Sequence, residues 1–327
     1  MKTFINSFIT ICFFFVTQVA CKKESDGLKV SPSNNSESKS GQLLFSRQEN
    51  SMPHVQIFVL NLENGEETQL TFSRGSSPIS NYNPIWSPTH NEFVFSSNKD
   101  GSSFEIYTMN LDDSTTTRLT NNTLSDLDPN YSPDGSQIIY IHDENKLSIV
   151  NKDGSDLKQI SFSKAVINRI YNPQWSPDGS KIMFESFTNN GTVNSLYEID
   201  SDGSNLTLLT NDRSLTMTEA SYSPDGSKIV FSSTVATDGI IQITELYMMN
   251  RDGSNVVRLS NFGRSSSRYY RTTYAPYWSP NGTHLAFVSS KSGGNFNVDL
   301  FTMKLDGSDL QQLTNTSDAL EVNPSWK

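Results

Sequence analysis

A short segment built around an aromatic residue recurs six times in this 327-residue chain, and it constrains the fold more than any other feature. In three copies the aromatic residue is followed by Ser-Pro-Asp-Gly, and in a fourth by Ser-Pro-Asn-Gly. Successive aromatic residues are separated by 45, 44, 47, 56 and 48 residues; they are Trp86, Tyr131, Trp175, Tyr222, Trp278 and Trp326. A period of about 40 to 45 residues is typical of a four-stranded propeller blade.

Each repeat carries the same order of strand and turn signals. The aromatic segment predicts a short strand, and the Pro and Gly that follow predict a tight turn. An alternating strand comes next, as at residues 228–231, and then a polar loop and a third strand, as at residues 246–250. The Asp-Gly pair at residues 252–253 predicts a hairpin turn into a fourth strand that ends in Leu-Ser.

The two ends of the repeat region are complementary. Residues 42–71 contain a second strand (43–45), a third (57–60) and a fourth (68–71), with no aromatic strand before them. Residues 323–326 are an aromatic strand with nothing after it. We therefore predict an all-β fold over residues 42–327: a six-bladed β-propeller in which the C-terminal strand closes the first blade and removes exposed edges.

The N-terminal residues resemble a targeting signal. Lys2 and the apolar residues 4–19 predict a signal peptide over residues 1–20. The sequence Gln18-Val19-Ala20-Cys21 resembles a bacterial lipobox, which implies an acylated Cys21, although Gln18 stands where Leu is usual; the alternative is an ordinary secretory signal cleaved near Ala20. Residues 21–41 lack the apolar content needed to pack and predict a flexible tether. The expected location is the cell envelope, as an outer-membrane lipoprotein on the periplasmic side or the cell surface.

The repeats resemble the WD40-like, or PD40, repeats of the TolB propeller family over about residues 42–327. The periplasmic member of that family has an additional α/β domain ahead of its propeller, and here a short tether stands in that place, so a TolB-like propeller is expected. The resemblance implies a protein-binding surface on one face of the ring, around the central channel. It implies no particular partner.

Composition and motifs argue against several kinds of chemistry. A net charge of −10 disfavours nucleic acid as a partner, because phosphate binding needs clustered Lys and Arg. No Gly-x-Ser-x-Gly motif is present, which argues against a serine hydrolase. The four histidines fall on turns at opposite faces of the expected propeller, so they cannot converge on one metal ion. Residues 200–205 resemble the start of a calcium loop, but they fit a hairpin turn better. We therefore expect a monomer that is not an enzyme and has no cofactor or metal.

The acidic residues near the expected channel mouth are interpreted as solvated side chains on loops; they are Asp126, Asp128, Glu219, Asp318 and Glu321. Two carboxylates facing each other across the channel would instead favour a carbohydrate-binding or carbohydrate-active propeller, which stays open as the alternative. A purely structural envelope component is a third possibility.

Loops that lead into the aromatic strands and loops between second and third strands should share one face of the ring. The longest interval between repeats contributes five Tyr and Arg residues to that face: Arg268, Tyr269, Tyr270, Arg271 and Tyr274. Tyr and Arg are enriched at interface hot spots. Further candidates on the same kind of loop are Tyr82, Asn168, Arg169 and Tyr171. The simpler alternative is that Tyr274 and another tyrosine pack between blades.

Overall fold

A computed structural model describes residues 40–49, 54–73, 78–161, 167, 169–187, 194–210, 215–237, 241–260, 273–290 and 297–327. Its repeat region, Lys39–Lys327, forms one compact unit. The predicted signal peptide and Cys21 lie outside the described residues, so those predictions remain untested.

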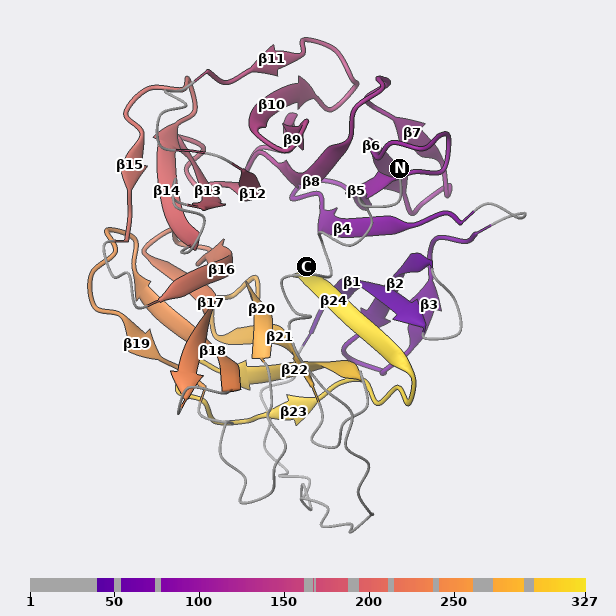
Figure 1. The fold of residues 1–327 in the computed structure, drawn as a ribbon. Helices are drawn as coiled ribbons and strands as arrows, with labels where there is room; N and C mark the ends of the chain where they lie inside the picture. Colours follow the sequence, from indigo (N-terminus) through magenta and orange to yellow (C-terminus); the bar gives the residue numbers. More distant parts are fainter. Residues whose placement is uncertain are drawn as a thin grey trace. The chain divides into compact units, whose positions relative to one another are not determined.

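The regular secondary structure of the described segments is entirely β, and its sheets surround a common centre (Figure 1). Four sheets have four strands each. The first contains β4 (Asn81–Trp86), β5 (Glu92–Ser97), β6 (Glu105–Asn110) and β7 (Thr116–Arg118), and the second contains β8 (Asp126–Tyr131), β9 (Gln137–His142), β10 (Lys146–Asn151) and β11 (Lys158–Gln159). The third contains β12 (Ile170–Trp175), β13 (Lys181–Phe187), β14 (Asn194–Asp200) and β15 (Thr207–Leu208), and the fourth contains β16 (Thr216–Tyr222), β17 (Lys228–Thr237), β18 (Ile241–Asn250) and β19 (Val257–Arg258). This confirms an all-β propeller arrangement.

The remaining described strands form one eight-stranded sheet. It contains β20 (Thr273–Trp278), β21 (His284–Ser290), β22 (Val298–Lys304), β23 (Gln311–Gln312), β24 (Ala319–Trp326), β1 (Gln42–Glu49), β2 (Val55–Asn61) and β3 (Glu67–Gln69). β24 runs antiparallel to β1, and it also meets β22 through a single parallel pair, Val298 with Leu320. The pairing thus differs from the expected six separate four-stranded sheets. The physical reason is that β24 is eight residues long, so its N-terminal end, at Leu320, reaches the neighbouring β22.

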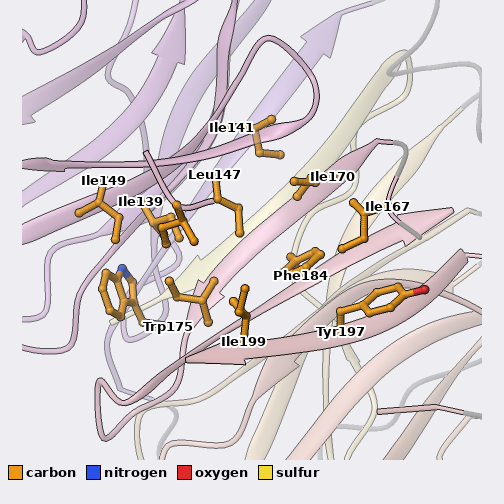
Figure 2. Packing of buried hydrophobic residues seen from close by; sticks show 12 residues of the cluster. Ile139, Ile141, Leu147, Ile149, Ile167, Ile170, Trp175, Phe184, Tyr197 and Ile199 are labelled. Atoms are coloured by element: carbon orange, nitrogen blue, oxygen red, sulfur yellow. The ribbon is translucent and has the colours of Figure 1, made fainter. Parts of the chain in front are cut away.

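The core lies between adjacent sheets, where the aromatic residues of the repeats are buried. Figure 2 shows one such layer: Trp175 of one sheet lies beside Ile139 and Ile149 of the sheet before it, and Phe184 belongs to the same buried cluster. Phe184 also stacks on Tyr197, with ring centroids 5.7 Å apart. Burial of each such side chain stabilises the fold by about 1.5–3 kcal/mol, so the layers between sheets hold the ring together.

Six of the described strands lie innermost and share a local irregularity. Each of them has a register shift in its pairing with the neighbouring strand of its sheet, and each has one residue in the left-handed conformation, with φ between 46° and 55°. These inner strands are β4, β8, β12, β16, β20 and β24. The left-handed residues are Asn83, Asp128, Asn172, Glu219, Ala275 and Asn323. The residue that follows is Pro in five strands and Ala220 in the sixth. A bulge of this kind re-aims a side chain, and here it positions the candidate site.

Candidate functional site

The centre of the propeller contains an open cavity of about 80 Å³, lined by residues from all six inner strands. All six left-handed residues are in its lining, and we refer to them together as the channel belt: Asn83, Asp128, Asn172, Glu219, Ala275 and Asn323. Asn is among the residues that enter the left-handed region most readily, which explains why it occupies three of the six positions. The belt therefore presents amide and carboxyl groups to the cavity.

Hydrogen bonds within the belt join neighbouring sheets. The side-chain amide of Asn83 donates to Asp128 Oδ1, and the backbone N–H of Asn172 donates to Asp128 Oδ2 at 3.2 Å. In the same way, the backbone N–H of Ala275 donates to Glu219 Oε2 at 2.7 Å. Because the acceptor and donor come from consecutive inner strands, each of these bonds ties two sheets together at the channel.

A third carboxyl group lies behind the belt. Glu185 of β13 accepts hydrogen bonds from the Ala220 N–H at 3.0 Å, from the Asn172 amide at 3.2 Å and from the Asn194 amide at 3.1 Å. Ala220 stands where the other inner strands have Pro, so it has a backbone N–H that they lack. Glu185 satisfies that extra donor.

Burial raises the pKa of all three carboxyl groups. The pKa of Asp128 rises to about 6, that of Glu219 to about 7 and that of Glu185 to about 8. Repulsion adds to this effect, since the charge of Asp128 raises the pKa of Glu219, and the charge of Glu219 raises the pKa of Glu185. The channel can therefore change charge near neutral pH.

The expectation that the acidic residues near the channel are solvated is wrong for four of the five. Asp126, Asp128 and Glu321 are buried, and Glu219 is half-buried, whereas Asp318 is exposed. Asp126 is paired with His142 at 2.7 Å and Glu321 with Arg47 at 2.6 Å. These four residues belong to strands rather than loops: Asp126 and Glu321 lie opposite their basic partners on the paired strand, and Asp128 and Glu219 lie in the lining of the cavity.

Three of the predicted tyrosines occupy equivalent places. Tyr82, Tyr171 and Tyr274 each directly precede the left-handed residue of their strand, and all are half-buried. The ring centroid of Tyr82 lies 5.5 Å from that of Phe104. Tyr171 is hydrogen-bonded to Arg169, and burial raises its pKa, with a smaller contribution from the charge of Asp128. We call these three residues the tyrosine rim.

Tyr274 also packs against the apolar cluster that contains Ala275 and Val288. The simpler alternative, in which Tyr274 is a packing residue, therefore agrees with part of its surroundings. Arg169 pairs with Glu144 at 2.5 Å, which joins a loop into an inner strand to a loop between second and third strands. The backbone N–H of Ser80 likewise donates to Asn98 Oδ1 at 2.8 Å. These contacts bring the two kinds of loop to one face, as predicted.

Several predicted site residues fall outside the described segments: Arg268, Tyr269, Tyr270, Arg271 and Asn168. The channel belt, in contrast, was not anticipated from the sequence. A signal for it was present, because Asn-Pro or Asp-Pro precedes the aromatic residue in four repeats, and Asn and Asp tolerate the left-handed conformation.

The described segments contain no group of three or more His, Cys, Asp or Glu side chains arranged to hold a metal ion. Asp200, in the calcium-like sequence, is instead engaged by Lys181 and Asn205 in a turn. Nor do the same segments form any helix with the length and apolar character needed to cross a membrane.

The model of the PD40 family, the TolB β-propeller domain, matches residues 19–184, which is just over half of the chain. The chain belongs to this family. Among solved structures, it is similar to TolB from Acinetobacter baumannii, with 19% identity and a TM-score of 0.69 over 88% of this chain and 66% of that one. It is also similar to an oligogalacturonate lyase in complex with manganese, with 17% identity and a TM-score of 0.55 over 85% of this chain and 74% of that one.

A curated relative is an uncharacterized protein of Agrobacterium fabrum, 29% identical over 139 residues, which are 39% of this chain and 46% of the relative. The chain thus matches less than half of this relative and just under two thirds of the Acinetobacter protein. At these identities the solved structures establish a TolB-like propeller fold and nothing about activity.

Proposed function

We propose that this TolB-like propeller is a non-catalytic, monomeric protein of the cell envelope that binds a protein or peptide partner at the channel mouth. In this proposal residues 1–20 are a signal peptide, Cys21 carries the lipid that anchors the protein to the outer membrane, and residues up to 41 are a tether. The eight-stranded sheet counts as two blades, the second of them closed by β24, so the propeller has six. The repeated bulge in six inner strands supports this count.

The tyrosine rim above the channel belt is the observation that carries the proposal. Half-buried tyrosines supply large contact area and a hydroxyl group at little entropic cost, which is typical of recognition surfaces. Below them the belt offers amide and carboxyl groups for directional hydrogen bonds. The loop residues Arg268, Tyr269, Tyr270 and Arg271 would extend this surface.

The test is capture of a partner from envelope extract by the immobilised protein, with identification by mass spectrometry. The double variant Tyr82→Ala, Tyr171→Ala should lose that partner. Leu157→Ala serves as the control, because Leu157 is exposed on the outer part of its sheet, away from the channel. Equal recovery by all three proteins would reject the channel mouth as the binding surface. The pair Tyr270→Ala, Arg271→Ala tests the loop extension in the same assay.

A carbohydrate-active propeller is the second candidate, and one observation favours it. Asp128 and Glu219 face the same cavity, and their pKa values of about 6 and 7 allow one group to be protonated while the other is ionised. Such a division of roles is what glycoside hydrolysis requires. Incubation with a panel of glycans, including polygalacturonate, decides between the two. Product formation that is abolished by Asp128→Asn would favour this candidate over the binding protein.

A further inference from the structure

Six buried carboxylates elsewhere in the described part of the protein have basic partners. Six such pairs have separations between 2.6 and 3.1 Å: Glu321 with Arg47, Glu92 with Lys152, Asp126 with His142, Glu245 with Arg258, Glu198 with Arg251 and Glu105 with Arg118. Pairing is the expected arrangement, since an isolated buried charge costs several kcal/mol. The fold therefore supplies a basic group to each of these six carboxylates.

The channel carboxylates lack this arrangement. Asp128, Glu185 and Glu219 form no ion pair with any residue in the described segments. Glu219 lines the cavity; the Ala275 N–H donates to its Oε2 atom, and within the described segments no donor reaches its Oε1 atom. This leaves one carboxylate oxygen available to a ligand.

We propose that the channel binds a cationic group of its ligand, the ammonium group of a lysine side chain or of a peptide N terminus, between Glu219 and Asp128. This inference rests on the proposed function, because it names the chemistry of the peptide bound at the channel mouth. An ammonium group carries three N–H donors and no acceptor, which complements a lining of carboxylate and amide oxygens. The net charge of −10 would also attract such a ligand.

A divalent cation fits the described residues less well. Calcium needs about six to eight oxygen ligands, and both oxygens of Asp128 already accept hydrogen bonds from Asn83 and Asn172. An ammonium group can share an oxygen that already accepts one hydrogen bond, because each carboxylate oxygen has two lone pairs. The donor set therefore favours an organic cation.

The experiment is isothermal titration of the full-length protein with an end-blocked tetralysine peptide in low-salt buffer at pH 8, with end-blocked tetraglutamine as the uncharged probe. Tetralysine should bind with one site per protein, and tetraglutamine should not bind. Glu219→Gln should weaken tetralysine binding by about tenfold, the scale expected for loss of a close charge pair.

Asp225→Asn is the matched control, since it removes the same charge from an exposed turn outside the channel. The chain already has Asn281 in the equivalent turn, where it accepts the same hydrogen bond from the turn serine. This control should bind tetralysine within twofold of the unchanged protein. If both variants weaken binding equally, the attraction is diffuse and the proposed site is wrong.

A folding defect in Glu219→Gln is checked with Glu219→Asn, because Asn occupies three equivalent belt positions. Lower pH provides an independent readout: binding should weaken at pH 5.5, where Glu219 is protonated. Failure of this inference is distinct from failure of the proposed function. If the envelope partner is lost in the tyrosine variant but retained by Glu219→Gln, the cation site is wrong and the binding surface stands.

Discussion

The pairing of β1 with β24 and the channel place buried carboxylates in opposite electrostatic surroundings. Between β1 and β24, Arg47 lies between Glu321 at 2.6 Å and Glu67 at 2.5 Å, and its guanidinium lies 4.5 Å from the ring centroid of Phe58. In the channel, Glu185 is equally buried, but its described partners are neutral amides. Both environments remove the carboxylate from water, and the first alone supplies an opposite charge.

The presence or absence of a basic partner distinguishes carboxyl groups that stabilise the fold from carboxyl groups that are candidates for a functional role. Burial raises the pKa of Glu321, the charge of Arg47 counteracts that rise, and the pair joins two strands from opposite ends of the chain. The channel carboxyl groups have no basic partner in the described segments, and the pKa of Glu185 rises to about 8. Groups with strongly perturbed pKa values that lie beside a cavity are candidates for a functional role.

Removal of Arg47 should have the largest effect. Arg47→Met leaves Glu321 buried without a cation, and the free energy of unfolding should fall by about 3–5 kcal/mol. Urea denaturation followed by tryptophan fluorescence measures this change. The double variant Arg47→Met, Glu321→Leu should recover most of the loss, because paired removal leaves no isolated charge. A loss below 1 kcal/mol in the single variant would mean that the pair contributes little to closure of the ring.

The channel carboxyls should make the protein less stable as pH rises. Their pKa values are higher in the folded protein than in the unfolded chain, so the folded state binds more protons. Stability should be highest below about pH 4.5 as far as these groups are concerned, and it should fall as pH increases through 6 to 8.

Glu185→Gln tests this sign, because the variant cannot ionise. At pH 9 it should be more stable than the unchanged protein by roughly 2 kcal/mol, with little difference at pH 5. Thermal unfolding at both pH values provides the measurement. A variant that is less stable than the unchanged protein at pH 9 would show that the three amide donors hold Glu185 ionised.

The repeats allowed the fold to be predicted in detail, because period, turn residues and strand alternation are local signals. They placed Tyr82, Tyr171 and Tyr274 on the loops that lead into the aromatic strands, whereas these residues lie within β4, β12 and β20, because the inner strands begin earlier than the aromatic segment indicates. The same signals could not reveal the belt, since the bulge depends on how each inner strand pairs with the next. Asp128 and Glu219 were therefore interpreted as solvated acids, and Glu185 was not identified as a candidate residue. Burial and pairing between distant strands decide the chemistry of all three.

Ala220 and Glu185 should act as a coupled pair. Other inner strands have Pro where β16 has Ala220, and three other second strands have Ser where β13 has Glu185, at Ser46, Ser96 and Ser232. Ala220→Pro removes an N–H that Glu185 accepts, and it should cost about 1 kcal/mol. Adding Glu185→Ser should restore the pattern of the other repeats and reduce that cost. A double-mutant cycle measures the coupling, and additive effects would contradict it.

The smallest change in stability should come from Arg169, whose ion pair with Glu144 is more than one-third exposed on both sides. Arg169→Met should alter the free energy of unfolding by less than about 0.5 kcal/mol, because solvent screens exposed pairs. Arg169 is also hydrogen-bonded to Tyr171 of the rim, so the same variant should weaken partner capture although the fold is intact. Denaturation and capture measured on one protein preparation separate the two effects. Intact capture would mean that Tyr171 needs no support from Arg169, whereas a large loss of stability would mean that this surface pair belongs with the buried pairs between sheets.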